Sequence, residues 1–442
     1  MADAWAEPTH VTDLANNPSA PSALEHETVP AAASQPDAPE RVELMAARHP
    51  IYDEQLHVAA YELVLHAREA DGGLSAGHGA ATPEAVTAVA DALIGSHPVH
   101  VKVSREVLLS GAATTVPADR IVLEVPPEAG CDELLADALH SLRRTGHSVV
   151  LDNFRYQEDA ASLARSAQAI KLDAGTLHPD QLTREVKLAR GLRDDIRLIA
   201  TGIGTHDTFD LCRDLGFELF QGFFFLEPEP GDRETLKPSQ AARIRLLGSL
   251  QGDCPDFDRL EEIISQDIGL SYALLRFVNS AFFALPRDVQ SVRDAAVLLG
   301  SSNMRRWATL SVLADSAEHK PGELVLTGLT RARMCELLTP AYGQRDVDAF
   351  FTAGLFSIVD ALMDVPMVHV LSSLPLSREI NSAILNFDGQ KGEALRAAVA
   401  WERGNLGELI TPPTTSVGEV GEMYRDAVMW AASAAAGLRP AA

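Results

Sequence analysis

Two patterns of hydrophobic and polar positions divide the chain. From residue 41 to about 238, short apolar runs alternate with amphipathic stretches. After Ser239, nearly every segment carries apolar residues at i, i+3 and i+4. The first pattern predicts strands separated by helices, and the second predicts an all-α helical bundle. Pro, Gly and acidic residues at Pro228–Pro238 predict a linker, which places the domains at 41–238 and 239–442.

The strand-like runs of the first domain are apolar throughout, which is typical of strands in a parallel sheet covered by helices. They lie at Val99–Ser104, Ile121–Val125, Ser148–Asp152, Ala169–Asp173, Arg197–Ile203 and Leu219–Phe225. The helices expected between them lie at Pro83–Ser96, Asp132–Thr145, Asp159–Ser166, Arg184–Leu192 and Asp207–Leu215. This number of units favours a closed α/β barrel over an open sheet. Barrel active sites use the carboxyl ends of strands, where this chain has Ser104, Glu124, Asp152, Asp173 and Gln221.

The helices expected in the second domain lie at Asp256–Gln266, Leu270–Ser280, Ser291–Leu299, Ser302–Leu313, Leu329–Leu338, Val347–Met363 and Ser377–Leu385. The helical pattern continues after Gly389. Residues 1–40 are rich in Ala, Pro and acidic residues, so they are expected to form a disordered leader, with a cleaved or artificial extension as the alternative.

The charge balance excludes some function classes. Lys and Arg number 37 against 62 Asp and Glu, a formal charge of −25, which disfavours bulk nucleic acid and anionic membranes as partners. No apolar run is long enough to predict a membrane span. The four cysteines are far apart and no secretory signal is recognisable, so a reducing, cytoplasmic location is expected.

Seven short segments follow one another between residues 43 and 230: YELVL at Tyr61–Leu65, then VHVKVS, IVLEV, LDNF, AIKLD, LIATGIGT and ELFQGFFFLEP. In this order they resemble the EAL family of cyclic di-GMP phosphodiesterases. The resemblance implies a TIM-like barrel in which two divalent metals activate water. It carries the family's acidic positions over to Glu62, Glu124, Asp152 and Asp173, and the lysine that helps to position water to Lys171.

Other positions depart from the EAL pattern. Lys102 stands at an asparagine ligand, and Asn153 at the second acid of an Asp-Asp pair. Acidic positions of the family also align with Thr201, Gly204 and Pro127, and a phosphate-contacting arginine aligns with His66. An ammonium group repels a cation and has no lone pair to donate to it. We therefore expect no catalytic residues and no metal, and retain Gln221, Lys102 and His66 as candidate ligand contacts.

Lys102 also generates a hypothesis of its own. If Glu62, Glu124 and Asp152 converge without a cation, one of them is forced to hold a proton. The ammonium of Lys102 is expected to pair with these carboxylates in place of a metal. The alternative is that Lys102 points to the surface of a pocket that has lost its role.

The second domain resembles the HDOD family, the catalytically silent relative of the HD phosphohydrolases. The resemblance covers about residues 239–440 and is most specific at Leu274–Pro286, where NSAFF is followed by LP. The His-Asp metal pair of the HD enzymes aligns with Ser357 and Ile358, and isoleucine cannot bind a metal. Phe277, Phe282 and Phe283 are expected in the core, and Asn279 is expected to cap or brace a helix junction.

Arg305, Arg306 and Trp307 form a small basic and aromatic cluster. It fits contact with a partner's carboxylate or a stacked base. The alternative is a solvated helix face with a buried tryptophan.

Three interpretations of function remain. The first is a non-catalytic bacterial signalling protein that binds a protein partner through its HDOD domain, with interdomain geometry as the variable. The second is an active or cyclic di-GMP-gated phosphodiesterase that forms pGpG, with one Mg²⁺ or Mn²⁺ held by Glu62, Glu124 and Asp152. The third is an unrelated barrel enzyme that uses Lys171 as a Schiff-base or acid–base residue. Cyclic di-GMP stays a candidate ligand, and homodimerisation stays open.

Overall fold

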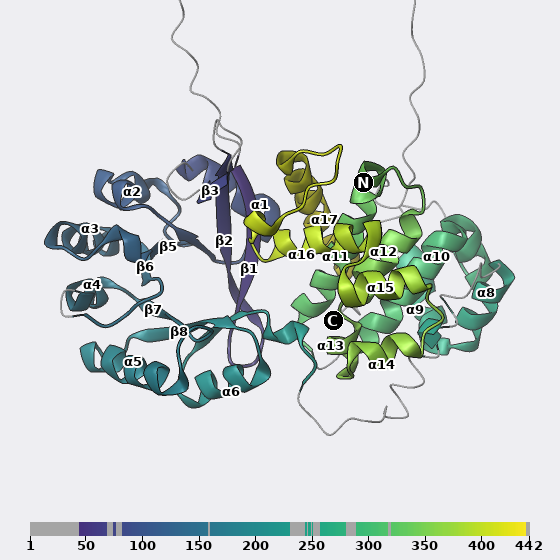
Figure 1. Cartoon of the computed structure of the whole chain (residues 1–442), viewed down its shortest axis with the longest axis horizontal. Helices are drawn as coiled ribbons and strands as arrows, with labels where there is room; N and C mark the ends of the chain where they lie inside the picture. Colours follow the sequence, from purple (N-terminus) through teal and green to yellow (C-terminus); the bar gives the residue numbers. More distant parts are fainter. Residues whose placement is uncertain are drawn as a thin grey trace, which may run out of the picture.

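The structure is a computed structural model with a barrel and a helical bundle side by side (Figure 1). It describes residues 44–68, 74–76, 82–157, 160–229, 244, 246–248, 250, 257–279, 289–316 and 320–438. The expected leader at 1–40 and most of the expected linker at 228–238 lie outside the described residues. None of the described helices is both long and apolar enough to cross a bilayer.

Eight described strands close into a barrel, and a ninth short strand, β3, extends from β2. Their bounds are β1 Leu44–Tyr52, β2 Val58–Arg68, β3 Leu74–Ala76, β4 Val99–Lys102, β5 Ile121–Val125, β6 Ser148–Leu151, β7 Ala169–Asp173, β8 Arg197–Ile203 and β9 Leu219–Gly222. The sheet is parallel from β2 through β4 to β9. The closed barrel predicted from the sequence is thus confirmed.

The sequence missed two strands of this sheet. β1 runs antiparallel to both of its neighbours, β2 and β9, so the sheet is not parallel throughout. β1 and β2 were missed as strands because their apolar and polar residues are mixed, whereas the predicted strands are apolar throughout. The predicted strand at Leu219–Phe225 ends at Gly222 and is followed by a 3-10 helix at Phe224–Leu226, η5.

Helices cover the outside of the barrel (Figure 1). Their bounds are α1 Pro83–Ile94, α2 Arg105–Ser110, α3 Glu133–Arg144, α4 Ala160–Ser166, α5 Pro179–Leu192 and α6 His206–Asp214. Local sequence sets where they begin, because the side chains of Thr82, Asp132 and Thr205 accept hydrogen bonds from the first turns of α1, α3 and α6. The sequence did not predict α2, which Ser104 caps at the end of β4.

All described regular elements of the second half are helices, as predicted. Its helices are α8 Phe257–Gln266, α9 Ile268–Val278, α10 Val292–Ser316, α11 Gly322–Leu338, α12 Val347–Phe356, α13 Val359–Met363, α14 Met367–Ser372, α15 Arg378–Asn386, α16 Gly389–Glu402 and α17 Val417–Leu438. The helices predicted at 291–299 and 302–313 are the two parts of α10, which is kinked at Gly300.

The single helix predicted at Val347–Met363 was wrong, because the chain breaks between α12 and α13. At the break, Arg331 of α11 donates to the hydroxyl of Ser357 at 3.1 Å, and that hydroxyl donates to the carbonyl oxygen of Gly354. The carbonyl oxygen of Gly354 thus accepts a hydrogen bond from a side chain, which competes with the backbone hydrogen bonds of a continuous helix. Apolar periodicity does not report such a break.

Strand β1 joins the barrel to the bundle. The indole nitrogen of buried Trp401, on α16, donates to the carbonyl oxygen of Ala46 at 3.1 Å. Glu323 of α11 accepts a hydrogen bond from the hydroxyl of Tyr61 and lies 3.6 Å from the guanidinium of Arg48. The side chains of Arg48 and Glu323 are only 10% and 6% exposed, so this ion pair is shielded from solvent between the two halves.

Removing the charge of Glu323 tests whether this contact holds the halves together. We expect Glu323→Gln to lower the free energy of unfolding by about 3–5 kcal/mol, because it leaves the arginine buried without a counter-charge. Urea denaturation followed by circular dichroism measures the change. The matched control is Glu379→Gln, which removes an ion pair whose carboxylate is 78% exposed and should change stability little. An equal effect of both variants would contradict a structural role for the pair.

Candidate functional site

A cavity of about 530 Å³ opens at the carboxyl ends of the barrel strands. Because parallel strands end at one rim, residues from β2, β4, β6, β8 and β9 meet there. The polar side chains that line it are His49, Glu62, Lys102, Asp152, Thr201, Gln221, Glu227 and Arg403. All but Arg403 belong to the barrel, and Arg403 follows helix α16 of the bundle.

Two lysines neutralise the carboxylates at the floor of this cavity. The ammonium of Lys102 lies 3.3 Å from Glu62 and 3.0 Å from Asp152. The ammonium of Lys171, which is fully buried, lies 2.7 Å from Glu62 and is also in contact with Glu124. The expected pairing of Lys102 with Glu62 and Asp152 is therefore present, whereas Glu124 pairs with Lys171 and with the ring of His100 at 2.8 Å.

The pKa values follow from burial and these charges. Burial alone would raise the pKa of Glu62, but Lys171 and Lys102 lower it well below its usual range. Burial likewise opposes the charge on both lysines, and the surrounding carboxylates outweigh it and raise the pKa of each. Asp152 behaves differently, since burial and the charge of Glu124 raise its pKa in spite of Lys102.

The residues present do not fit a pair of divalent metals. Both oxygens of Glu62 and one oxygen of Asp152 are already paired with ammonium groups. A divalent ion about 4 Å from an ammonium group is repelled by roughly 8 kcal/mol at an effective dielectric constant of about 20. Asn153, which follows Asp152, brings no charge to offset this repulsion. Among the described residues, no three His, Cys, Asp or Glu side chains are grouped to hold a metal ion.

Gln221 lies at the centre of the site. Its side chain is 6% exposed, and its amide nitrogen donates to Glu62 at 2.7 Å. Its amide oxygen has no hydrogen-bond partner in the described part of the chain. A buried acceptor of this kind is rare in folded proteins, so it marks a place where a donor from outside the chain can bind.

Two of the sequence-predicted site residues lie elsewhere. Asp173 does not line the cavity, and its carboxylate accepts hydrogen bonds from Gly175 and Thr176 in the turn after β7. His66 lies on β2 beyond the cavity lining, opposite Ala76 of β3, and burial lowers its pKa. The structure therefore brings together Glu62, Glu124, Asp152, Lys102, Lys171 and Gln221 without Asp173 or His66.

Sequence reasoning missed three residues of the site: His49, His100 and Arg403. His49 lines the cavity, and its ring nitrogen Nε2 donates to the carbonyl oxygen of Glu402 at 3.1 Å. Burial lowers the pKa of His49, which favours the neutral ring. A histidine between apolar residues of a strand, as in VHVKVS, was the available signal for His100. No signal pointed to Arg403, because it comes from the other domain.

Ser357 and Ile358, which align with the metal-binding pair of the HD enzymes, make packing and hydrogen-bond contacts within the bundle. Ile358 is 2% exposed, and a Cβ atom on Gly328 would come within 2.5 Å of its side chain. Ser357 is engaged by Arg331, which also pairs with Glu402 through two contacts of 2.7 Å. Neither residue at this position is placed to bind a metal.

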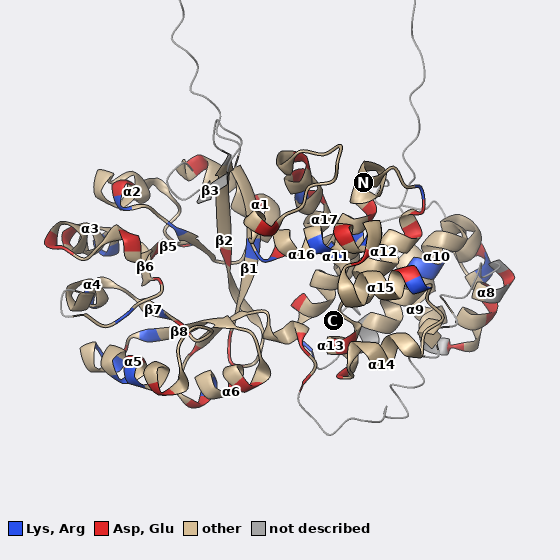
Figure 2. Ribbon diagram, viewed as in Figure 1, with Lys and Arg blue, Asp and Glu red and all other residues tan. Residues whose placement is uncertain are grey.

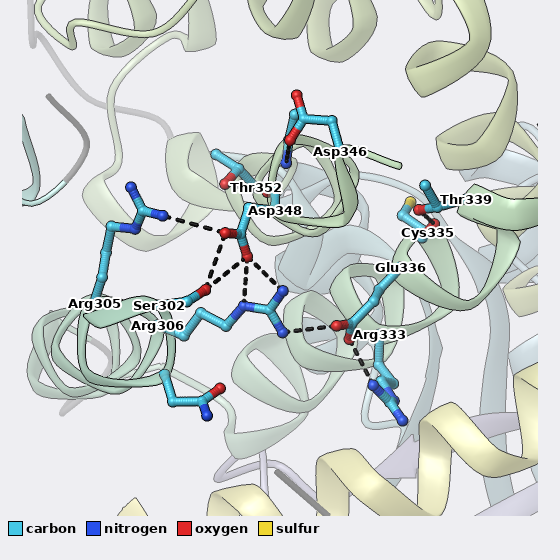
Figure 3. Close-up of polar contacts among 12 residues, drawn as sticks. Ser302, Arg305, Arg306, Arg333, Cys335, Glu336, Thr339, Asp346, Asp348 and Thr352 are labelled. Atoms are coloured by element: carbon cyan, nitrogen blue, oxygen red, sulfur yellow. Dashed lines mark hydrogen bonds and ion pairs between the residues drawn. The ribbon is translucent and has the colours of Figure 1, made fainter. Parts of the chain in front are cut away.

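Arg305 and Arg306 of the Arg305–Trp307 cluster pair with acidic residues of the same chain (Figure 3). Arg306 lies between two acidic residues, with contacts of 2.7 Å to Glu336 and 2.5 Å to Asp348. Arg305 reaches the same Asp348 at 3.2 Å, and Trp307 is 2% exposed. The network ties α10 to α11 and α12, which agrees with the structural alternative for this cluster.

The aromatic prediction holds in part. Phe277 is 7% exposed and stacks on Trp307, whereas Phe282 and Phe283 lie outside the described residues. Asn279 braces a junction as expected, because its amide nitrogen donates to the carbonyl oxygen of Val289 and its amide oxygen accepts from the N–H of Val289.

Comparisons with known proteins agree with the class defined by the fold, a barrel of the EAL type followed by an HDOD-like bundle. The family model described as EAL domain matches residues 101–228, and the one described as HDOD domain matches residues 238–401. A Vibrio cholerae protein described as cyclic di-GMP phosphodiesterase CdgJ is 30% identical over 294 residues, which cover 66% of this chain and 68% of that protein. The chain belongs to this family of EAL–HDOD proteins.

Two further similarities extend the comparison. The Bacillus subtilis protein YuxH is 24% identical over 378 residues, which cover 82% of this chain and 91% of YuxH. A solved structure of Klebsiella pneumoniae BlrP1, a complex with manganese and cyclic di-GMP, is 21% identical with a TM-score of 0.34. That similarity covers 45% of this chain and 58% of BlrP1.

Removing the ammonium of Lys102 tests its role in the site. Lys102→Ala should raise the pKa values of Glu62 and Asp152 and reduce stability at pH 7 by about 1–2 kcal/mol, between the values for exposed and buried pairs. The loss is small because the side chain is 38% exposed. In the variant, Glu62 and Asp152 destabilise the folded state only at pH values at which they are ionised. As the pH falls below about 5 they take up protons, so the difference in stability between parent and variant should become smaller.

Thermal unfolding of the parent protein and the Lys102→Ala variant between pH 4 and pH 8 measures the difference in their stability. Lys187→Ala is the control, because Lys187 is exposed on α5. A Lys102→Ala protein as stable as the parent at pH 7 would show that the ammonium does not offset the carboxylate charges.

Proposed function

We propose that the protein is a non-catalytic signalling protein, in which the EAL barrel no longer hydrolyses cyclic di-GMP and the HDOD bundle binds a protein partner. The observation that carries the first part is the ammonium group of Lys102, which stands at an asparagine ligand position of the EAL pattern and pairs with Glu62 and Asp152. This ammonium group places positive charge beside two of the carboxylates that a two-metal hydrolase needs for its metals.

The surface of the bundle supports the proposal that the HDOD bundle binds a protein partner. Tyr272, Val297 and Leu298 expose apolar side chains on α9 and α10, with exposed fractions of 67%, 72% and 46%. Figure 2 shows both acidic and basic residues on helices of the bundle, and the whole chain has 62 acidic against 37 basic residues. Such a surface suits contact with a protein better than contact with nucleic acid.

The second candidate is an active phosphodiesterase, and the name of CdgJ favours it. It requires that one Mg²⁺ or Mn²⁺ displaces Lys102 and is held by Glu62, Glu124 and Asp152. The third interpretation, with Lys171 as a Schiff-base residue, loses its support, because a lysine in contact with Glu62 and Glu124 holds its proton and is a poor nucleophile.

The purified full chain tests the two candidates directly. With cyclic di-GMP and either Mg²⁺ or Mn²⁺, we expect no pGpG above the level without protein, measured by chromatography over hours. A known phosphodiesterase under the same conditions is the positive control. Steady formation of pGpG that EDTA abolishes would establish the phosphodiesterase and reject the proposal.

A double variant tests whether Lys102 and Asn153 are what prevents the barrel mouth from binding a metal. Lys102→Asn removes the ammonium, and Asn153→Asp adds a carboxylate beside Asp152. We expect the parent to bind Mn²⁺ weakly or not at all and the double variant to bind it at least about tenfold more tightly, measured by calorimetry. Asn153 has a φ of 43°, a conformation that Asp also tolerates, so the exchange should not strain the backbone. Equal Mn²⁺ binding by both proteins would show that Lys102 is not what excludes the metal.

A further inference from the structure

The cavity at the barrel mouth is built from both domains. Its barrel residues include Lys102, Gln221 and Phe223, and Arg403 enters it from the turn after α16 of the bundle. A volume of about 530 Å³ lies in the range of small-molecule sites, roughly 300–1,000 Å³. The contribution of the bundle is therefore part of the wall that any bound molecule would contact.

Three residues around Arg403 fix the position of this turn against the barrel. Trp401 donates to Ala46 of β1, and Glu402 accepts at its carbonyl oxygen from His49. Gly404 has a φ of 67°, and a Cβ atom there would come within 3.1 Å of Val64. Arg403 stands between these contacts, so its backbone is held at the rim of the cavity.

The guanidinium of Arg403 is the uncommitted cation of the cavity. It lies 5.5 Å from the centre of the Phe223 ring. Among the described residues, no carboxylate forms an ion pair with it and no group forms a hydrogen bond with it, whereas Lys102 is paired with Glu62 and Asp152. A guanidinium that stacks on a ring keeps its N–H edge available, and that edge matches the oxygens of a phosphate.

Gln221 provides an independent second contact. Its buried amide oxygen lacks a donor, as described above, and the residue lines the same cavity. A ligand that satisfies both groups carries an anionic phosphate and an N–H or O–H donor. A nucleotide has both of these features, the phosphate in its backbone and the donors in its base and sugar.

We propose that Arg403 binds a phosphate group of a nucleotide held in the barrel mouth, so that barrel and bundle form one binding site. The bundle thus provides a cation that is not paired with the carboxylates of the barrel mouth, unlike Lys102. Glu402, the neighbour of Arg403, is held by Arg331, which also contacts Ser357 at the break between α12 and α13. Occupancy of the cavity is thereby connected to the interior of the bundle.

This inference goes beyond the proposed function, because it concerns binding and holds whether or not the barrel hydrolyses its ligand. Calorimetric titration of the full chain in EDTA tests it, with cyclic di-GMP, GMP and inorganic phosphate as separate probes. EDTA prevents metal-dependent turnover, so failure here is distinguishable from failure of the proposal on catalysis. We expect the parent chain to bind cyclic di-GMP or GMP.

Arg403→Gln should weaken that binding at least about tenfold, since a charge-assisted hydrogen bond is lost. Arg403→Lys keeps the charge without the planar fork and should show an intermediate loss. Arg425→Gln is the matched control, because it removes an arginine on α17 whose side chain is 48% exposed and should leave the Kd unchanged. Circular dichroism and thermal unfolding without ligand report whether each variant is folded.

Two results would overturn the proposal: equal nucleotide Kd values for the parent and folded Arg403→Gln, or no binding of any probe by the parent at millimolar concentration. If Arg403→Gln does not fold, Arg403→Lys decides in the same way, and a Kd equal to that of the parent overturns the proposal.

Discussion

Converging negative charge is the constraint that organises the barrel mouth. Glu62, Glu124 and Asp152 come from three strands and would repel one another without cations between them. Lys171 of β7 and Lys102 of β4 provide that charge from within the chain. Lys171 joins β7 to β2 and β5, which are not its neighbours in the sheet, and Lys102 reaches Asp152 after β6 as well as Glu62 on the neighbouring β2. The barrel therefore does not need a metal to balance these carboxylates, although a hydrolase of this type needs one to activate water.

Much of the fold was predictable because it depends on local patterns. Apolar runs identified the strands from β4 to β9, and i, i+3, i+4 periodicity identified most of the bundle. The antiparallel β1 was missed because its residues are only partly apolar, and the break at Ser357 was missed because it depends on Arg331, a residue of another helix. The resemblance to the EAL pattern also led to the hypothesis that Lys102 pairs with Glu62, Glu124 and Asp152, and the structure shows this pairing for Glu62 and Asp152.

The contacts between the domains could not be predicted from sequence patterns. Tyr61 and Glu323 are 262 positions apart, and nothing in the residues around either one indicates the other. The sequence suggested that interdomain geometry is variable, whereas the structure buries Arg48, Glu323 and Trp401 where the halves meet. Separating the halves would expose a tryptophan and leave buried charges without partners, which is costly. A change of geometry under these conditions would involve small shifts of packed groups more readily than free rotation of the domains.

Strand β1 places the domain contact and the cavity on one element. Ala46 and Arg48 contact the bundle, and His49 contacts both the cavity and the carbonyl oxygen of Glu402. A ligand that moves His49 or Arg403 must therefore also act on groups that hold the bundle in place. A signalling protein of this construction does not need turnover, since the free energy of binding alone can favour one arrangement of these contacts over another. The guanidinium of Arg403 and the ring of His49 line one cavity, so a single ligand can contact the bundle and the strand that holds it.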